Sequence, residues 1–240
     1  MANTDSYDEL DPYAAPKADL TRPVAGRSAT RGIDLATENP FLTIWTRPRA
    51  TIRGILDQNP TYLVIPLAMA GGVVQALDRA TQRNAGDALP LGAILGMALV
   101  AGSIGGLIGL YIGGALTGWA GRLLGGRGTG EEVRAALAWA EVPVLATIPI
   151  WIIQLALIGK EMFTSETPNL EANPALGLVL MATGVIEIVL GIWALVIMFK
   201  CVGEAHGFSA WKALGSMLLL VLIIAVPLFV IALLFFMAAR

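Results

Sequence analysis

The chain is poor in the residues that catalysis and metal binding need: its 240 residues include one cysteine and one histidine, and only 14% are charged. The lone cysteine, Cys201, excludes an internal disulfide framework. The lone histidine, His206, cannot complete a metal site or a catalytic triad, and scattered acids offer no paired-carboxylate site. We expect no enzyme activity, metal or cofactor. Because the charges crowd into residues 1–60 and short stretches between apolar runs, nucleic acid is excluded as a partner.

Long apolar runs fill the rest of the sequence. Hydrophobic residues make up 56% of the chain and its mean hydropathy is +0.70, whereas roughly a quarter of a soluble domain is charged. Each run can cross the roughly 30 Å hydrocarbon core of a bilayer. We therefore expect an all-α integral membrane protein with five transmembrane helices, at about residues 61–77, 91–119, 133–158, 174–199 and 213–237.

Composition divides the chain into three regions. Residues 1–38 hold few large aliphatic side chains, so we expect a disordered cytoplasmic tail. This tail begins with acidic residues, and no cleavable signal peptide is expected. Residues 39–60 form an amphipathic segment, and residues 61–240 form the five-helix transmembrane domain.

The amphipathic segment begins at Asn39-Pro40, a helix-start signal. Its apolar residues recur at helical spacing among arginines, which is typical of a helix that lies in the membrane interface. A short helix packed on a protein partner is the alternative. The interfacial residues that we expect are Trp45, Arg47, Arg49 and Arg53.

The second apolar run, residues 91–120, carries no charge and many glycines four positions apart. Bare helix faces let neighbouring helices approach closely, so we expect a central helix gripped by its neighbours, with a lipid-facing span as the alternative. The same faces allow a homo-oligomer. The candidate helix-packing residues are Gly102, Gly106, Gly109 and Gly113.

Two carboxylates lie inside apolar runs, Glu141 and Glu187, and Gln154 is a further intramembrane polar candidate. A central acidic residue costs roughly 2.5 to 3.5 kcal/mol on insertion scales, so we expect these side chains to face the bundle interior or a polar cavity. Gln75, Gln154, Thr147 and Thr183 are candidate hydrogen-bonding partners for the carboxylates. A structural hydrogen bond and a transport or gating role both remain open.

Charge and capping signals orient the chain. With a cytoplasmic N-terminus, twelve of the sixteen lysines and arginines lie inside and four outside, so we expect the C-terminus outside. Thr129 with Glu132 fits a capping box at the start of the third span, and Asn173 and Ser209 fit the starts of the fourth and fifth. The glycine-rich stretch 125–130 reads as a tight turn, beside which Arg122 and Arg127 can meet a lipid headgroup.

Three segments, NPFLTIWTRPRATIR at 39–53, EEVRAALAWAEVP at 131–143 and GFSAWKALG at 207–215, resemble the prokaryotic branch of the Yip (Ypt-interacting protein) family. The resemblance covers about residues 39–237. It implies five spans, a cytoplasmic N-terminus, a bacterial cytoplasmic (inner) membrane location and no catalytic residues. Eukaryotic members are associated with prenylated Rab GTPases, but a bacterial cell has no Rab cycle, so this role is not carried over.

We expect a non-enzymatic multi-pass membrane protein that organises the membrane or binds protein or lipid partners. The expected partners are the lipid bilayer and a membrane protein or a second copy of the chain. The alternative is a conduit, whether channel, transporter or lipid-moving protein, that passes a small solute, ion or lipid by means of Glu187 and Glu141.

Overall fold

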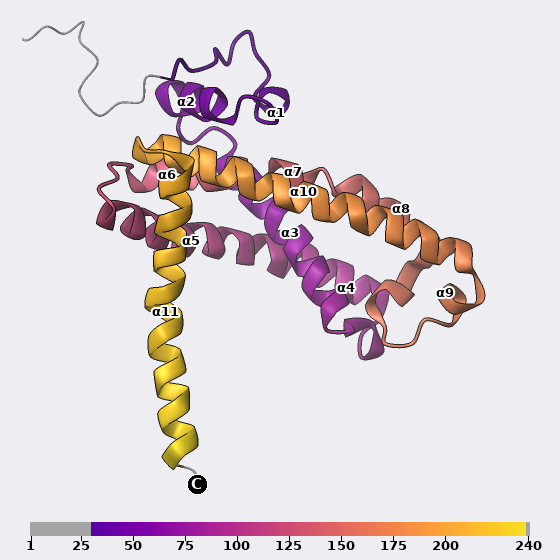
Figure 1. Ribbon diagram of the computed structural model, residues 1–240. Coiled ribbons are helices and arrows are strands. Elements are labelled where there is room, and N and C mark those ends of the chain that lie inside the picture. Colours follow the sequence, from indigo (N-terminus) through magenta and orange to yellow (C-terminus); the bar gives the residue numbers. More distant parts are fainter. Residues whose placement is uncertain (1–29, 239–240) are drawn as a thin grey trace, which may run out of the picture.

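The computed structural model describes residues 30–238, and the described residues form helices and turns without a strand (Figure 1). The predicted all-helical class is confirmed. In chain order the helices are α1 Pro40–Thr43, α2 Pro48–Gln58, α3 Val64–Gln82, η1 Ala85–Asp87, α4 Leu91–Met97, η2 Ala98–Gly102, α5 Ser103–Leu123, α6 Gly130–Ala140, α7 Val142–Leu145, α8 Ile148–Ile158, η3 Gly159–Phe163, α9 Pro168–Ala172, α10 Pro174–His206 and α11 Ala210–Ala238.

The predicted capping residues begin these helices. The Thr129 side chain accepts from the Glu132 amide at 3.2 Å, and the Glu132 carboxylate accepts from the Thr129 amide at 2.7 Å, so the capping box of α6 is confirmed. Asn39 and Asn173 cap α1 and α10, each with proline at the next position. Ser209 accepts from the Lys212 amide at the start of α11. These bonds satisfy amide donors that a helix end otherwise leaves unpaired.

Four stretches within residues 30–238 are long and apolar enough to cross a membrane: Leu91–Leu123, Gly130–Phe163, Pro174–His206 and Ala210–Met237. They correspond to the last four of the five expected spans. The remaining one falls on α3, a helix of 19 residues whose second half carries Asp78 and Arg79.

Prolines divide the stretch Gly130–Phe163 into α6, α7 and α8. Pro143 lacks an amide hydrogen and cannot continue the bonding of α6, which ends at Ala140. Pro149 then occupies the first turn of α8, where no amide hydrogen is required. Glu141 therefore lies at an interruption of the helix, and this places its side chain for the site described below.

Two hydrophobic cores hold the bundle, one at each end. We call these the α2 end, where α5 and α10 finish and α6 begins, and the α9 end, where α3 and α8 finish and α10 begins (Figure 1). The core at the α2 end includes Ile44, Ile55, Trp139, Ile197 and Cys201. The core at the α9 end includes Val74, Ile94, Trp151 and Phe163.

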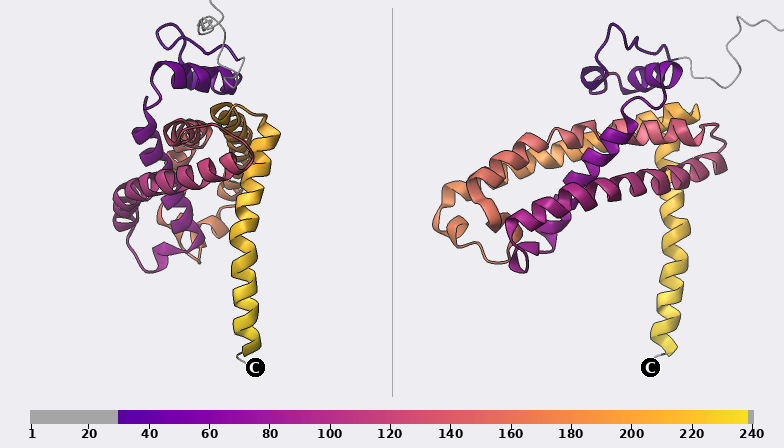
Figure 2. Two further views of the ribbon diagram at one scale, coloured as in Figure 1. Left: turned by 90° about the vertical axis from the view of Figure 1, so that its left-hand side faces the viewer. Right: turned by 180° about the vertical axis from the view of Figure 1, so that it is seen from behind.

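Helix α11 leaves the bundle at the α2 end and extends away from it, as both views of Figure 2 show. The turn between α10 and α11 requires the left-handed backbone of Gly207, whose φ is 73°. Ala213 and Ser216 near the start of α11 are buried, whereas its later large side chains such as Leu228 and Phe229 are exposed. Lipid is the solvent that suits such a surface.

The N-terminal part of the described chain packs on the protein. Ile33 is buried, its amide donates to the Ala50 carbonyl at 3.0 Å, and the Gln58 side chain donates to the Ile33 carbonyl at 2.7 Å. The prediction that order begins at Asn39 is therefore wrong for residues 30–38, because Ile33 supplies an apolar contact that holds this stretch against α2. Residues 1–29 of the predicted tail lie outside the described residues.

Helix α2 buries its apolar face against α6 and α10. Ile52 and Ile55 are fully buried there. We predicted that the membrane interface covers this face, and the structure corrects this: other helices of the chain cover it. An apolar stripe has the same spacing in both situations, so the sequence pattern did not distinguish them.

Candidate functional site

Two cavities inside the helix bundle share one carboxylate, that of Asp78 on α3. The first, of about 510 Å³, is lined by helices α3, α5, α6 and α10, and Glu141 and Asp78 are its acidic residues. The second, of about 430 Å³, lies toward the α9 end, and Asp78 lines it together with Glu187 and Gln154. The linings of the two cavities thus hold three acidic side chains, of which Asp78 belongs to both.

Of the four hydrogen-bonding partners that the sequence suggested, Gln154 bonds Glu187 directly and Thr183 bonds Gln154. The buried Gln154 amide nitrogen donates to the Glu187 carboxylate at 3.1 Å and to the Thr183 hydroxyl at 2.9 Å. The Thr183 hydroxyl in turn donates to the Val179 carbonyl at 2.9 Å within α10. This network joins α8 to α10 through polar side chains inside two apolar spans.

Glu141 lies at the interruption between α6 and α7 and faces α3 across the first cavity. A side-chain carbon added to Gly71 would lie 3.2 Å from a Glu141 carboxylate oxygen, so the absence of a side chain at Gly71 makes room for the carboxylate. Gln75 and Arg79 line the same cavity. Arg79 donates to the Gln75 side-chain amide oxygen Oε1 at 3.4 Å and adds one positive charge to this region.

Asp78 was not among the predicted site residues, because the first predicted span, residues 61–77, ends one position before it. The residue stands three positions after Gln75, so both side chains share one face of α3. That spacing was the available signal. Carboxylates that line two cavities with Asp78 in common can hold a proton or a small cation, and neutral glutamine and threonine neighbours can orient it.

A second polar cluster lies at the α2 end, and its centre is Glu204 on α10. The Glu204 side chain is completely buried. The Arg53 Nε atom donates to it at 2.9 Å, and an Arg49 nitrogen donates to it at 3.2 Å. Thr30 donates to the same carboxylate at 3.2 Å, so residues from three parts of the chain meet here.

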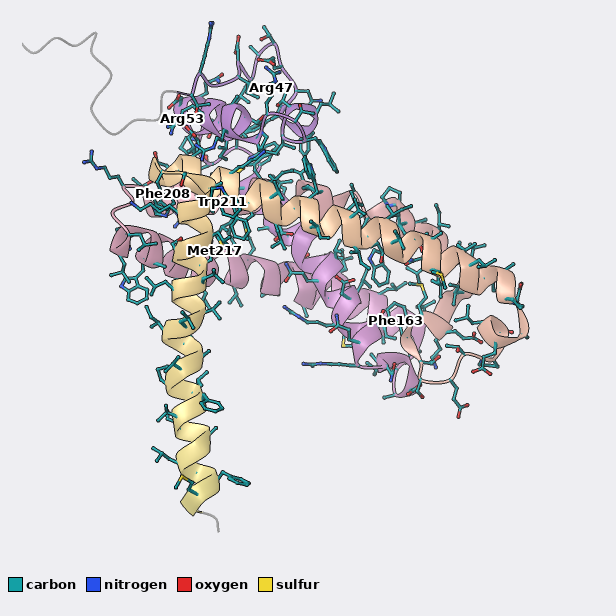
Figure 3. The ribbon with its side chains drawn as sticks, in the orientation of Figure 1. Arg47, Arg53, Phe163, Phe208, Trp211 and Met217 are labelled. Atoms are coloured by element: carbon teal, nitrogen blue, oxygen red, sulfur yellow. The ribbon has the colours of Figure 1, made fainter. Side chains whose placement is uncertain are left out.

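Two backbone carbonyls extend the Glu204 cluster. Arg53 donates to the Glu204 carbonyl at 3.0 Å, and Arg49 donates to the Phe208 carbonyl at 3.1 Å, across the junction where Figure 3 labels Arg53 and Phe208. Besides the carboxylate, Arg53 thereby binds the last turn of α10 and Arg49 binds the α10–α11 turn. The cluster fastens α2 to the place where two apolar helices meet.

The expected interfacial residues therefore have protein partners. Arg49 and Arg53 bind Glu204, Arg47 forms an ion pair with Glu38, and Trp45 packs partly buried against the core at the α2 end. We predicted Arg49 and Arg53 as residues of the membrane interface, and the structure instead pairs both with the buried Glu204 carboxylate. Arg49 and Arg53 are four residues apart, so both lie on one side of α2, beside its apolar stripe. Arginines beside a stripe that is buried indicate an acidic partner in the neighbouring helix.

His206 has a structural place in the same region. Its Nδ1 atom accepts from the Gly128 amide at 3.2 Å, and its ring stacks on Phe208 with 5.1 Å between the centroids. A carbon added to Gly126 would lie 2.5 Å from the His206 Nδ1 atom, so the glycine-rich turn after α5 fits around this ring.

Of the four glycines expected at helix contacts, two lie where α3 crosses α5. A side-chain carbon added to Gly102 would lie 2.9 Å from the Gly72 carbonyl, and one added to Gly106 would lie 2.9 Å from the Gly72 Cα. Carbons added to Gly109 and Gly113 would meet nothing within 4 Å. The prediction of close helix packing within the chain is therefore wrong for Gly109, which lines the first cavity, and for Gly113, which has open space beside it.

The apolar helices, two with polar groups turned inward, define the class of this protein: an integral, multi-pass α-helical membrane protein. The family model of the Yip1 domain matches residues 42–234. The chain belongs to the Yip1 domain family. Comparison with curated proteins and with solved structures found no match.

Proposed function

We propose that this protein is a non-enzymatic membrane component that presents residues 30–58, which we call the platform, to a protein partner at the membrane surface. The fastening of the platform by the buried Glu204 carboxylate is the observation that carries this proposal. A segment held in one orientation binds a partner without the entropic cost of ordering it first.

The platform carries an apolar surface that the rest of the chain does not cover. Leu42 on α1 is 70% exposed, and its neighbour Phe41 is partly exposed. Ile44, two residues further on, is fully buried, so α1 is fixed to the core on one side while it displays Leu42 on the other. Apolar anchors surrounded by polar groups are typical of protein-binding surfaces.

The proposed topology has five spans, with α3 as the first, in a bacterial cytoplasmic membrane. The charge distribution supports an inside location for the α2 end, because twelve of the sixteen lysines and arginines then lie inside. The platform is then cytoplasmic, and α11 carries the C-terminus to the outside. Cysteine labelling in a Cys201→Ser background tests this: a cysteine at Thr129 should react only from inside and one at Ser165 only from outside.

Photocrosslinking in cells tests the platform. A crosslinking amino acid at Leu42 should capture a discrete protein, and Glu204→Ala should reduce the yield because the platform is no longer held. The same amino acid at Ile152, which is 63% exposed on α8, is the matched control and should capture lipid. Absence of a protein adduct at Leu42, or identical adducts at both positions, would contradict the proposal.

A second candidate function, a conduit for protons or small cations, is favoured by the two cavities that share Asp78. Glu141 at one side and Glu187 at the other provide further carboxylates along this region. Only ionisation of these groups matters for such transport, whereas a structural role requires only their hydrogen bonds.

Replacing Glu187 separates these functions. If the residue is structural, Glu187→Gln should leave stability and flux unchanged, because an amide oxygen still accepts from Gln154. Glu187→Leu should then cost about 1 to 3 kcal/mol, since the buried Gln154 donor loses an acceptor. Proton and cation flux in liposomes is the measurement, with the exposed Glu171→Gln as control. Wild-type flux that Glu187→Gln abolishes would favour the conduit over the platform, and no flux above empty liposomes would contradict the conduit.

A further inference from the structure

Two arginine side chains, Arg122 from α5 and Arg134 from α6, lie over consecutive turns of one face of α5. Gly114 and Gly118 stand one turn apart on α5 and leave that face bare. The Arg134 side chain, from α6, crosses the first position, with its Cγ atom 2.7 Å from where a carbon on Gly114 would lie. An Arg122 nitrogen lies 3.4 Å from the corresponding point at Gly118. Because Gly114 and Gly118 have no side chains, the Arg134 and Arg122 side chains can lie directly against the backbone of α5.

Neither arginine has an acidic partner within residues 30–238. The Arg134 guanidinium lies over the Tyr111 ring, 4.9 Å from its centroid, which fixes its position without neutralising its charge. Glu132, one turn from the start of α6, is engaged with the Thr129 amide in the capping box. By contrast Arg47, Arg49 and Arg53 all pair with carboxylates. The α5–α6 hairpin holds three arginines against two glutamates, Glu131 and Glu132, so its net charge is positive.

The surroundings of this charge are those of a bilayer boundary. Arg122 ends one candidate span and Arg134 lies in the first turns of the next, at the same end of the bundle. Tyr111 is 54% exposed and Trp119 is also exposed, so apolar and aromatic surface surrounds the arginines on α5. Arginines near span ends extend toward the headgroup layer, where phosphate is the group within reach.

We propose that Arg122 and Arg134 bind the phosphate of one anionic phospholipid on the outer face of the α5–α6 hairpin. Guanidinium groups match phosphate oxygens in charge and in geometry, and two of them favour a lipid of net negative charge over a zwitterionic one. The acyl chains of this lipid lie along the exposed face of α5. The site is on a different surface from the platform and does not depend on it.

Native mass spectrometry of the full chain released from detergent tests the site with phosphatidylglycerol and phosphatidylcholine as probes. We expect the wild type to prefer phosphatidylglycerol by about tenfold, because the choline cation of phosphatidylcholine offsets the charge of its phosphate and repels the arginines. Arg122→Gln/Arg134→Gln should abolish the preference. Arg83→Gln/Lys160→Gln removes the same charge at the α9 end, from exposed side chains, and should retain it.

The exposed Arg122→Gln variant alone keeps the Arg134 packing intact and should lower the preference severalfold, so the test does not depend on folding of the double variant. Inorganic phosphate distinguishes the two sources of the anion. Millimolar phosphate should fail to displace the lipid, because its acyl chains add binding. Displacement by phosphate, an unchanged preference in the variants, or an equal loss in the α9-end control would overturn the proposal.

Discussion

Glu204→Ala should be among the most damaging single substitutions in this protein and should detach the platform from the bundle. The change leaves Arg53, whose side chain is 9% exposed, without its main carboxylate partner. Removing one member of a buried ion pair costs about 3 to 5 kcal/mol, because the remaining charge keeps its desolvation penalty. We expect a lower melting temperature in detergent and faster hydrogen exchange across α2.

Two further variants separate the charge from the packing. Arg53→Met/Glu204→Leu replaces both charges with apolar groups and should recover most of the lost stability, because no buried charge remains unpaired. Glu166→Ala removes an exposed glutamate at the other end of the bundle and serves as the control. If the Glu204→Ala protein has the same melting temperature as this control and its α2 amides still exchange slowly, the cluster does not hold the platform.

The starts of helices were predictable from sequence because capping is local. Thr129 and Glu132 need only a three-residue separation to satisfy each other, and the structure contains both bonds. The residues that pair with Glu204 were not predictable in this way. Arg53 lies 151 positions from Glu204, and only the packing of α2 on α10 brings them together.

The intramembrane site was predictable in part, for a similar reason. An acidic side chain inside an apolar run requires polar neighbours in any fold. For Glu187 these neighbours are Gln154 and, through Gln154, Thr183. Asp78 follows an apolar run and looks like a solvated helix end in the sequence. Its place between two cavities depends on how α3 crosses the bundle, which no local pattern specifies.

The spacing of the glycines predicted that another helix can approach α5 closely. It did not predict which of these glycines lie in the contact with α3. Gly102, Gly106, Gly109 and Gly113 look equivalent in the sequence. The position of Gly72 on α3 determines which of the four lie in the contact, because the backbones of α3 and α5 can meet only where neither helix has a side chain. Further along α5 the helices diverge, so the same residue type faces open space.

Gly106→Leu should therefore disrupt the bundle, whereas Gly109→Leu on the same helix should be tolerated. A carbon added to Gly106 meets the Ala68 carbonyl and lies 2.9 Å from the Gly72 Cα, so the obstacle is backbone that cannot turn aside. Overpacking costs typically about 1 to 3 kcal/mol, and a leucine against backbone belongs at the upper end of that range or above it. A carbon added to Gly109 has nothing within 4 Å.

The two leucine variants carry the same added volume and hydrophobicity, so any difference between them reports the α3–α5 crossing. Melting in detergent and the yield of membrane-inserted protein are the measurements. We expect Gly106→Leu to lose both, and Gly72→Leu to behave in the same way, since a carbon on Gly72 would lie 2.6 Å from the Gly106 Cα. Equal melting of the Gly106→Leu and Gly109→Leu proteins would show that the close crossing of α3 and α5 does not stabilise the fold.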